Sequence, residues 1–320
     1  MSLTTLGGGT GLGNLLRGLK HHVGSEIAEL TAVVAVTDDG GSSGRLRRDF
    51  GVLPPGDIRS CIVALADDED LLARLFQYRF GDGEGLSGHS FGNLFLAALS
   101  GITGDFYEAI LTAESVLSVR GRILPATLTD LHLQARGQSG RTYDGESAIG
   151  KSGEPLHDVR LEPAEPIAFP PAVEAIEEAD LVLLGPGSLY TSVITNLLIP
   201  GIADAVKASR GTVVLPVNLM TQPGETDGLD AIAHLDAIER HAGEGLVDVA
   251  LVNSNGIPAE RLPAYEEEGS TPVVVDRSAL ESRGVEVVER DLLADGPLVR
   301  HDPAKLSRAI LELVHRGGER

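Results

Sequence analysis

Short apolar segments that end in glycine and polar residues recur along this chain, and helical segments follow them. The first, LTTLGGGTGLGNLLRGL at residues 3–19, predicts a strand, a tight turn and a helix. LTAVVAVTDDGG (30–41), LVLLGPGSL (181–189), GTVVLPVNLM (211–220) and LVDVALVNSN (246–255) have the same character. Near-continuous apolar strands are typical of parallel sheets covered by helices on both faces. The sequence therefore predicts an α/β fold with a doubly wound, Rossmann-like parallel sheet.

Two regions interrupt this alternation. From Pro54 to about Ser118, apolar residues recur at three- and four-residue spacing, which predicts a mostly helical segment. From about 124 to 166, apolar and polar residues alternate between glycines and prolines, which predicts a small antiparallel β excursion. TPVVVD at 271–276 is expected to be a strand and PAKLSRAILELVHR at 303–316 a helix. We expect one domain, residues 1–320, that contains the excursion.

Charge and composition limit the classes of ligand and the cellular compartment that we expect for this protein. Acidic residues number 47 against 26 basic ones, for a formal charge of −21, and nucleic-acid binding is disfavoured because it needs a positive surface. The single cysteine, Cys61, excludes an intrachain disulfide and suits a reducing compartment. The first residues lack the pattern of a signal peptide, and the longest apolar runs are too short to span a bilayer. We expect a soluble cytoplasmic protein that binds neither nucleic acid nor membrane, and we expect a homodimer.

Glycine and polar residues gather where the predicted strands end. The segments are GGGTG (7–11), TDDGGSSG (37–44), GPGSLYTS (185–192), NLMTQPGET (218–226) and NSNG (253–256). Ligands of open α/β sheets bind at that edge, where glycines let the backbone approach a phosphate and helix N-termini supply N–H donors. Any one segment alone is better explained by a tight turn, but five at one edge favour a phosphate-bearing, nucleotide-like ligand. The first loop does not fit G-x-G-x-x-G, which weakens an NAD interpretation.

Three motifs imitate catalytic or nucleotide-binding sites. GESAIGKS (145–152) spells a P-loop, but Pro155 follows where the motif requires a helix. GGSSG (40–44) spells a serine-hydrolase elbow, but the preceding aspartates would oppose an oxyanion. GHSFG (88–92) spells a second elbow, yet no strand precedes it and the sequence pairs no base with Ser90. We predict that Ser90 caps a helix and regard a serine hydrolase as a disfavoured alternative.

Taken together, six segments resemble the gluconeogenesis-factor family and its relatives, the 2-phospho-L-lactate transferases of deazaflavin cofactor synthesis (YvcK/CofD-like proteins). They are GGGTGLGNLLRGLK, VTDDGGSSGRLR, LPPGDIRSCIVAL, GHSFGNLFLAAL, LGPGSLYTSVITNLLIPGI and VNLMTQPGET, in family order over residues 6–226. The run is more similar to the gluconeogenesis-factor branch than to the transferases. That branch implies binding of a UDP-sugar such as UDP-N-acetylglucosamine and a link to cell shape and cell-wall precursor supply during gluconeogenic growth.

The resemblance also implies ligand-binding residues. One group would line the nucleotide (Gly8, Gly9, Thr10, Gly11), a second would take the diphosphate (Gly185, Gly187, Ser188, Thr191), and a third would lie beside it (Asn218, Thr221). A fourth would face the sugar or acceptor (Asp38, Asp57, His89, Asn93), Thr37 would also bind the ligand, and Tyr265 and Arg300 would lie near the nucleotide-sugar. For Asp57, a buried ion pair with Arg59 or a helix cap is the alternative.

Two functions remain open at this point. The first is a regulatory protein that binds a nucleotide-sugar without turnover, which we favour because no catalytic residue is evident. The second is a 2-phospho-L-lactate transferase-like enzyme that transfers a phosphorus-containing group from a nucleoside diphosphate donor. In that case Asp38 would hold Mg²⁺ on the diphosphate, because carboxylates and substrate phosphates are the usual Mg²⁺ ligands.

Overall fold

A computed structural model gives the structure of the chain and describes residues 1–66, 71–81 and 85–317. Its main sheet has seven parallel strands in the order β10-β9-β8-β7-β1-β2-β3. The strands are β1 (Ser2–Gly7), β2 (Glu29–Val34), β3 (Arg122–Pro125), β7 (Leu181–Leu184), β8 (Thr212–Pro216), β9 (Val249–Asn253) and β10 (Glu286–Arg290). Because β1 lies between β2 and β7, the strand order reverses beside β1, and the predicted doubly wound fold is confirmed.

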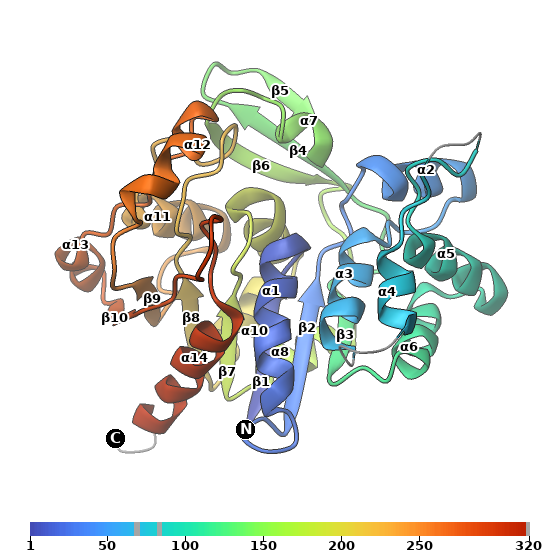
Figure 1. Ribbon diagram of the computed structural model, residues 1–320, viewed down its shortest axis with the longest axis horizontal. Helices are drawn as coiled ribbons and strands as arrows, with labels where there is room; N and C mark the ends of the chain where they lie inside the picture. Colours follow the sequence, from blue (N-terminus) through green and yellow to red (C-terminus); the bar gives the residue numbers. More distant parts are fainter. Residues whose placement is uncertain (67–70, 82–84, 318–320) are drawn as a thin grey trace.

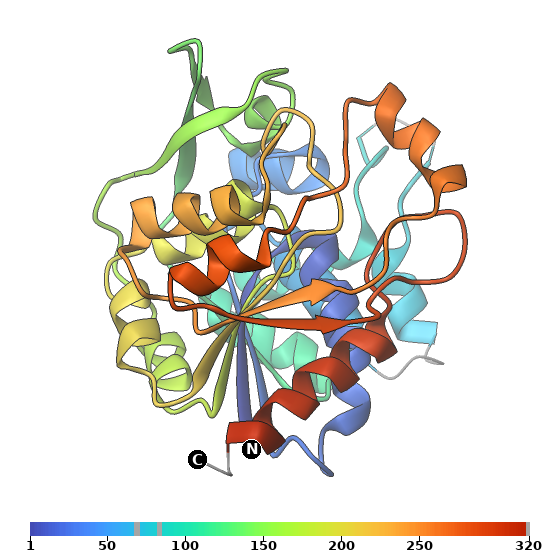
Figure 2. The same ribbon diagram turned by 90° about the vertical axis from the view of Figure 1, so that its left-hand side faces the viewer.

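Helices cover both faces of this sheet (Figures 1 and 2). One face carries α1 (Gly9–Leu19), α3 (Gly56–Leu65) and α14 (Pro303–Gly317); the other carries α8 (Pro170–Glu177), α10 (Ile202–Ala208), α11 (Ala231–Ala242) and α13 (Arg277–Ser282). The neighbouring β7 residues Leu183 and Leu184 are both buried, yet they belong to separate cores on opposite faces. The apolar runs therefore arise as predicted, because alternate side chains of each strand enter different cores.

The helical segment lies beyond the β3 edge of the sheet (Figure 1). It contains α4 (Leu71–Gln77), α5 (Phe91–Thr103) and α6 (Phe106–Val116), next to α2 (Gly41–Phe50). The remaining short helices are η1 (Lys20–His22), α7 (Glu146–Ile149), η2 (Leu189–Ile194), α9 (Thr195–Leu197), η3 (Ala259–Arg261) and α12 (Leu262–Glu267). Within the described ranges, no single helix combines the length and apolarity that a membrane crossing needs. Leu189–Leu197 and Ile202–Ala208 reach that composition only as a pair bent by 76°.

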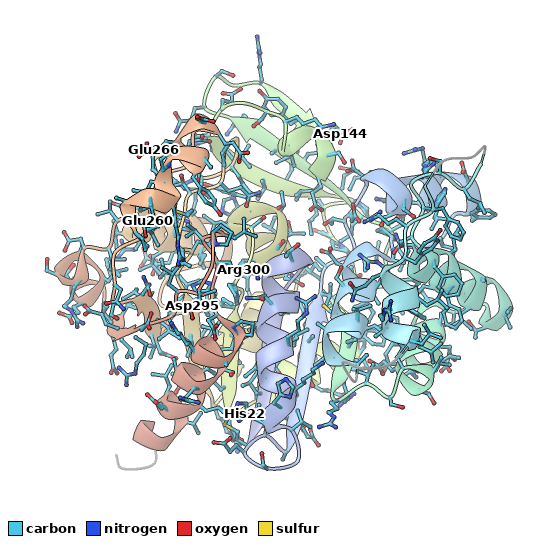
Figure 3. All side chains as sticks on the ribbon, in the orientation of Figure 1. His22, Asp144, Glu260, Glu266, Asp295 and Arg300 are labelled. Carbon is cyan, nitrogen blue, oxygen red and sulfur yellow. The ribbon has the colours of Figure 1, made fainter. Side chains whose placement is uncertain are left out.

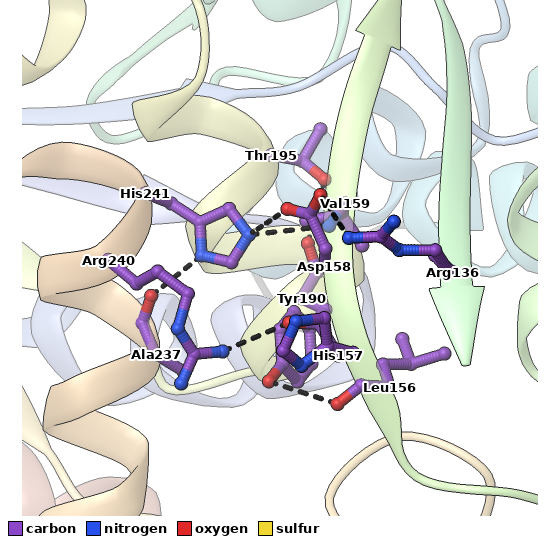
Figure 4. A network of polar contacts seen from close by, with 10 residues as sticks. All are labelled: Arg136, Leu156, His157, Asp158, Val159, Tyr190, Thr195, Ala237, Arg240 and His241. Atoms are coloured by element: carbon purple, nitrogen blue, oxygen red, sulfur yellow. Dashed lines mark hydrogen bonds and ion pairs between the residues drawn. The ribbon is translucent and has the colours of Figure 1, made fainter. Parts of the chain in front are cut away.

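The predicted β excursion is a three-stranded antiparallel sheet in the order β5-β4-β6. Its strands, β4 (His132–Gly137), β5 (Thr142–Asp144) and β6 (Leu156–Glu162), span a shorter range than the predicted 124–166. Leu124 and Pro125 belong instead to β3 in the main sheet. Contacts from β6 to α11 and η2 attach the small sheet (Figure 4): His241 Nε2 lies 3.0 Å from Asp158 Oδ1, and Arg240 donates to the His157 carbonyl at 2.9 Å.

The predicted strand at 271–276 is wrong. This segment forms only an isolated bridge from Pro272 to Met220. Its backbone bonds go to the loop after β8, where Thr221 donates to the Thr271 carbonyl at 2.7 Å, and to the start of α11, where Ala231 donates to the Val274 carbonyl at 2.9 Å. The seventh strand is β10, which pairs with β9 and which we did not predict. The charged residues of β10 suit its position, because edge strands commonly carry charge that blocks further pairing.

Candidate functional site

The carboxyl ends of β1 and β7 lie side by side at the point where the strand order reverses. The chain leaves β1 at Gly7 toward α1 and leaves β7 at Leu184 toward η2. Chains that turn away on opposite faces leave a crevice between them, which is where open α/β sheets bind ligands. The predicted loops GGGTG and GPGSLYTS therefore face each other across this crevice.

Close packing explains two glycines of the first loop. A β-carbon at Gly8 would lie 2.4 Å from Asp57 Oδ2, and one at Gly11 would lie 2.6 Å from the Pro186 carbonyl oxygen. Gly8 is the N-cap of α1, so the loop presents the start of an 11-residue helix to the crevice. A helix start of this kind offers N–H groups and a positive dipole end to an anion, although the Asp57 carboxyl already accepts from the Gly9 N–H.

Two asparagines fix the loops relative to each other. Asn196, fully buried in α9, donates through Nδ2 to the Gly7 carbonyl at 3.1 Å and to the Ser192 carbonyl at 2.7 Å. Asn218 donates to the Gly187 carbonyl at 3.0 Å. We predicted Asn218 but not Asn196, which lies in an apolar run where only the fold reveals its contact with β1.

The loop after β8 closes a third side of the crevice. Ser188 donates to Gln222 Oε1 at 2.7 Å, and the Thr191 N–H donates to Glu225 Oε1 at 2.9 Å. Burial raises the pKa of Glu225 to about 7, although the Thr191 N–H opposes the shift. The Thr191 backbone therefore joins the loop after β7 to the loop after β8, and Glu225 places a titratable carboxyl beneath the loop after β7.

A cavity of about 470 Å³ lies among these loops. Ten predicted residues line it: Gly8, Gly9, Thr10, Gly11, Gly187, Ser188, Asn218, Thr221, Tyr265 and Arg300. Tyr265 is held by its hydroxyl, which accepts from the Val299 N–H at 2.8 Å, and Figure 3 places Arg300 beside α1. Lining residues that we did not predict include Asn14, Arg17, Glu146, Ser192, Gln222 and His301.

The other predicted residues surround the cavity without lining it. Gly185 and Thr191 belong to the second loop, and Thr37 is buried just before Asp38. Asp38 accepts from the Gly40 N–H at 2.9 Å and lies against Gly56, at the start of α3. Asp57, in the first turn of α3, joins this group to the cavity because it touches Gly8. Burial and then nearby Asp38 raise the pKa of Asp57 to about 6.

His89 and Asn93 join the start of α5 to the start of α2. His89 Nδ1 lies 2.9 Å from Ser42 Oγ, and Asn93 Nδ2 donates to Ser43 Oγ at 3.2 Å. Ser90 Oγ accepts from the Asn93 N–H at 3.2 Å, which confirms the predicted helix cap. The adjacent histidine bonds to Ser42 and not to Ser90, so this geometry gives Ser90 no base from His89.

One cavity residue comes from the small sheet. Glu146 begins α7, and the Ser147 N–H donates to Asp39 Oδ1 at 2.8 Å, which anchors α7 to the loop after β2. Burial, with Asp57 and Asp38 nearby, raises the pKa of Glu146 to about 9. Glu146 lies inside the segment that imitates a P-loop, but α7 ends at Ile149, before Lys151, and so does not begin at the lysine as the helix of a P-loop does.

A larger hollow of about 630 Å³ lies at the opposite edge of the sheet. Its lining includes Thr212, Asp248 and Glu286, at or next to the starts of β8, β9 and β10. No predicted site residue lines it. We place the functional site at the smaller cavity, because helix starts and glycine loops meet there rather than at the amino ends of strands.

Fold and site together define an open, doubly wound α/β protein with a glycine-lined crevice at its switch point. The family described as 2-phospho-L-lactate transferase CofD matches residues 3–293, and the chain belongs to this family. The resemblance drawn from the six segments is thereby confirmed.

Relatives named gluconeogenesis factor match this chain over nearly its whole length, which supports its similarity to that branch of the family. The gluconeogenesis factor of Bacillus subtilis (strain 168) is 44% identical over 313 residues, with 98% of each chain covered. That of Halalkalibacterium halodurans is 46% identical over 312 residues, covering 97% of this chain and 96% of the relative. A crystal structure of a UPF0052-family protein from Bacillus halodurans has a TM-score of 0.92 and 45% identity, covering 97% of this chain and 98% of that one.

Proposed function

We propose that this protein binds a nucleotide-sugar, of the UDP-N-acetylglucosamine type, in the 470 Å³ cavity and acts as a regulatory gluconeogenesis factor in the cytoplasm. The observation that carries the proposal is the pair of glycine loops, Gly8–Gly11 and Gly185–Ser188, facing each other across the switch point. Helix starts and backbone N–H groups at that place suit a diphosphate. The volume is in the range that small-ligand sites occupy.

The rest of the cavity suits a polar, uncharged sugar and a base. Amide and hydroxyl side chains at Asn218, Thr221 and Gln222 offer both donors and acceptors. Tyr265 and Arg300 close the far side, where an aromatic ring and a guanidinium can contact a base. We propose that Thr37, Asp38, Asp57, His89 and Asn93 act on the sugar side through the Asp57–Gly8 contact.

Calorimetry with UDP-N-acetylglucosamine tests the proposal. Wild type should bind it, and Thr10→Val should bind about tenfold more weakly, because Thr10 is exposed at the cavity and loses its hydroxyl while keeping its shape. Thr142→Val, an exposed threonine of β5 outside the cavity, is the matched control and should bind like wild type. Absence of binding at millimolar ligand would refute the proposal.

We further propose that ligand occupancy links the supply of cell-wall precursors to cell shape during growth on gluconeogenic carbon. The relatives named gluconeogenesis factor support only the link to gluconeogenic growth in this proposal. A strain lacking the gene should regain normal cell width on gluconeogenic carbon when it carries wild type or Thr142→Val, but not Thr10→Val. Full rescue by Thr10→Val would show that normal cell width does not depend on ligand binding.

A transferase is the second candidate, because the matching family is described by 2-phospho-L-lactate transferase. Among the described residues, no three His, Cys, Asp or Glu side chains are placed to hold a metal ion. In this candidate we propose that Mg²⁺ binds together with the diphosphate, with Asp38, which lies next to the cavity and not in its lining, as its protein ligand. This candidate predicts metal-dependent consumption of a deazaflavin acceptor with a nucleoside diphosphate donor; an inactive wild type in that assay removes it.

A further inference from the structure

The segment that imitates a P-loop crosses between two glycine-rich loops at the carboxyl edge of the main sheet. At its first residue, Gly145, a β-carbon would lie 1.8 Å from Asp39 Oδ2, in the loop after β2. At its last residue, Ser152 Oγ donates to the Gly224 carbonyl at 2.7 Å, in the loop after β8. Figures 1 and 2 both place the small sheet over this edge. We call residues 145–152 the strap, because they tie the small sheet to both loops.

The strap brings one carboxyl side chain to the cavity. Glu146 lines the cavity, whereas Lys151, at the position of a P-loop lysine, is exposed and lies outside the lining. The start of α7 is fixed on one side by the Ser147 N–H, which donates to Asp39, and on the other by Ile149, which is buried in the core. The neighbours of Glu146, and not its own side chain, therefore hold it in the cavity wall.

The Glu146 carboxyl faces acids from three elements. They are Asp57 of α3, Asp38 and Asp39 of the loop after β2, and Glu225 of the loop after β8. Burial, and then these charges, raise the pKa of Glu146 to about 9. The carboxyl therefore keeps its proton at neutral pH.

This proton has no acceptor in the part of the chain that the structure describes. No residue of 1–66, 71–81 or 85–317 forms a hydrogen bond or an ion pair with the Glu146 side chain, and its oxygens reach the cavity surface. The cations of the lining, Arg17 and Arg300, are likewise not paired with it. A protonated carboxyl offers one O–H donor, and buried polar groups are normally matched by a partner. Glu146 is therefore free to bond to a molecule in the cavity.

We propose that Glu146 contacts the bound nucleotide-sugar as a neutral carboxyl and donates a hydrogen bond to its diphosphate. This inference rests on the proposed function, because it assigns one more contact to the same ligand. Two of the acids that face Glu146 touch the loops proposed to hold the diphosphate: Asp57 lies against Gly8, and Glu225 accepts from the Thr191 N–H. An ionised carboxyl there would repel the phosphates, whereas a protonated one adds a donor to them. The strap thus completes the anion site that the glycine loops begin.

Calorimetry at pH 7 with UDP and with UDP-N-acetylglucosamine tests this contact, with EDTA present so that no metal ion changes the charge of the site. Glu146→Leu removes the donor and should bind both ligands about tenfold more weakly than wild type. Glu146→Gln keeps a donor in its amide and should bind within about threefold of wild type. Lys151→Gln, in the same strap but outside the lining, is the control and should bind like wild type. Circular dichroism shows whether each variant is folded.

The pH dependence of binding tests whether the proton of Glu146 makes the contact. Between pH 7.5 and 9.5, wild type should lose about fourfold in affinity relative to Glu146→Gln, because the glutamate ionises over this interval and the glutamine does not. Groups that titrate in both proteins, and in the ligand, cancel in this ratio. A side chain that only fills space would leave the ratio constant, and a constant ratio would overturn the proposal. If Glu146→Leu does not fold, this ratio decides alone.

The two ligands separate the failure of this contact from the failure of the proposed function. Equal affinities of wild type and Glu146→Leu for both ligands would overturn the contact and leave the proposed function standing. Weaker binding of UDP-N-acetylglucosamine alone would place Glu146 against the sugar and overturn the diphosphate contact. A wild type that binds neither ligand would refute the proposed function and this inference together.

Discussion

Gly11 lies against the loop after β7 with no room for a side chain, since a β-carbon would be 2.6 Å from the Pro186 carbonyl oxygen. Gly11→Ala should therefore push α1 away from the second loop and widen the crevice. We expect the free energy of unfolding to fall by about 1–3 kcal/mol, as for other overpacked sites. Affinity for UDP-N-acetylglucosamine should fall at least tenfold. Urea denaturation and calorimetry measure the two effects.

Gly13→Ala is the matched control in the same helix. A β-carbon at Gly13 has its nearest neighbour, the Ser60 carbonyl oxygen, at 3.7 Å, which is an ordinary contact. Alanine favours a helix over glycine by roughly 1 kcal/mol, so this variant should be as stable as wild type or more so. If Gly11→Ala behaves like Gly13→Ala, close packing of the two loops is not what requires glycine at residue 11.

Glu225 should make stability depend on pH. Its pKa is about 7 in the folded protein, against 4.5 for an unperturbed glutamate, because the side chain is buried. A raised carboxyl pKa means that the folded state holds the proton more tightly. Its contribution to stability is complete below about pH 4.5 and is lost as pH rises through about 7, up to about 3 kcal/mol.

Urea denaturation at pH 5 and pH 8 tests this dependence. Wild type should be less stable at pH 8, and Glu225→Gln should lose a smaller part of its stability over that interval. The amide oxygen can still accept from the Thr191 N–H, so the loop contact survives. Asp57 and Glu146 shift in the same direction and leave a residual slope. Equal slopes in wild type and variant would contradict a raised pKa at Glu225.

Glycine loops were the predictable part of the site, because a strand, a glycine turn and a helix are neighbours in sequence. Asn196 was not predictable: it contacts Gly7 from 189 residues away, within an apolar run. Glu146 was hidden in a segment that we rejected as a P-loop, correctly for its local structure. Glu146 lines the cavity because the small sheet folds over the crevice, and no local sequence pattern encodes that placement.

At the scale of the element, Asp39 links the short helix α7 to the loop after β2. Asp39 Oδ1 accepts from the Ser147 N–H at the start of this four-residue helix, and Glu146 enters the cavity beside it. A helix of one turn has little stability of its own. Asp39→Ala should therefore release α7 and displace Glu146.

Hydrogen exchange followed by mass spectrometry should detect that release. In Asp39→Ala, amides of residues 145–150 should exchange about tenfold faster, which corresponds to losing one hydrogen bond to a charged group. Asp144→Ala, in β5 of the same small sheet, is the control and should exchange like wild type. Unchanged exchange in Asp39→Ala would show that other contacts position α7.

Element prediction succeeded where burial on both faces gives a continuous apolar run and failed at the edges of the sheet. The run 271–276 is apolar enough for a strand, but Pro272 lacks an N–H and the segment bonds to the loop after β8. The edge strand β10 carries three charged residues in five and gives little apolar signal. The helix α2 was missed because glycine and serine fill its first turn, and both have low helix propensity.

At the scale of the whole molecule, the protein and its proposed ligand carry charge of the same sign, because the chain is strongly acidic and a nucleotide-sugar is an anion. The formal charge of −21 creates a long-range field that opposes the approach of a nucleotide-sugar, whereas the N–H groups of the glycine loops attract it only at short range. The acid side chains of Asp38 and Asp57 near the cavity add to the repulsion, whereas Glu146, whose pKa is raised to about 9, is protonated and uncharged at pH 7. The association rate should therefore be lower than for an uncharged protein of the same shape.

Added salt should relieve this repulsion, because it screens the field over distances beyond about 10 Å. Between 20 and 300 mM salt, stopped-flow measurements should show the association rate of UDP-N-acetylglucosamine rising several-fold, while the dissociation rate, governed by short contacts, changes little. Basic nucleotide-binding surfaces give the opposite dependence. A rate that falls with salt would mean that Arg17, Arg300 and the helix starts dominate the field at the cavity mouth, and that the acidity of the chain is confined to distant surfaces.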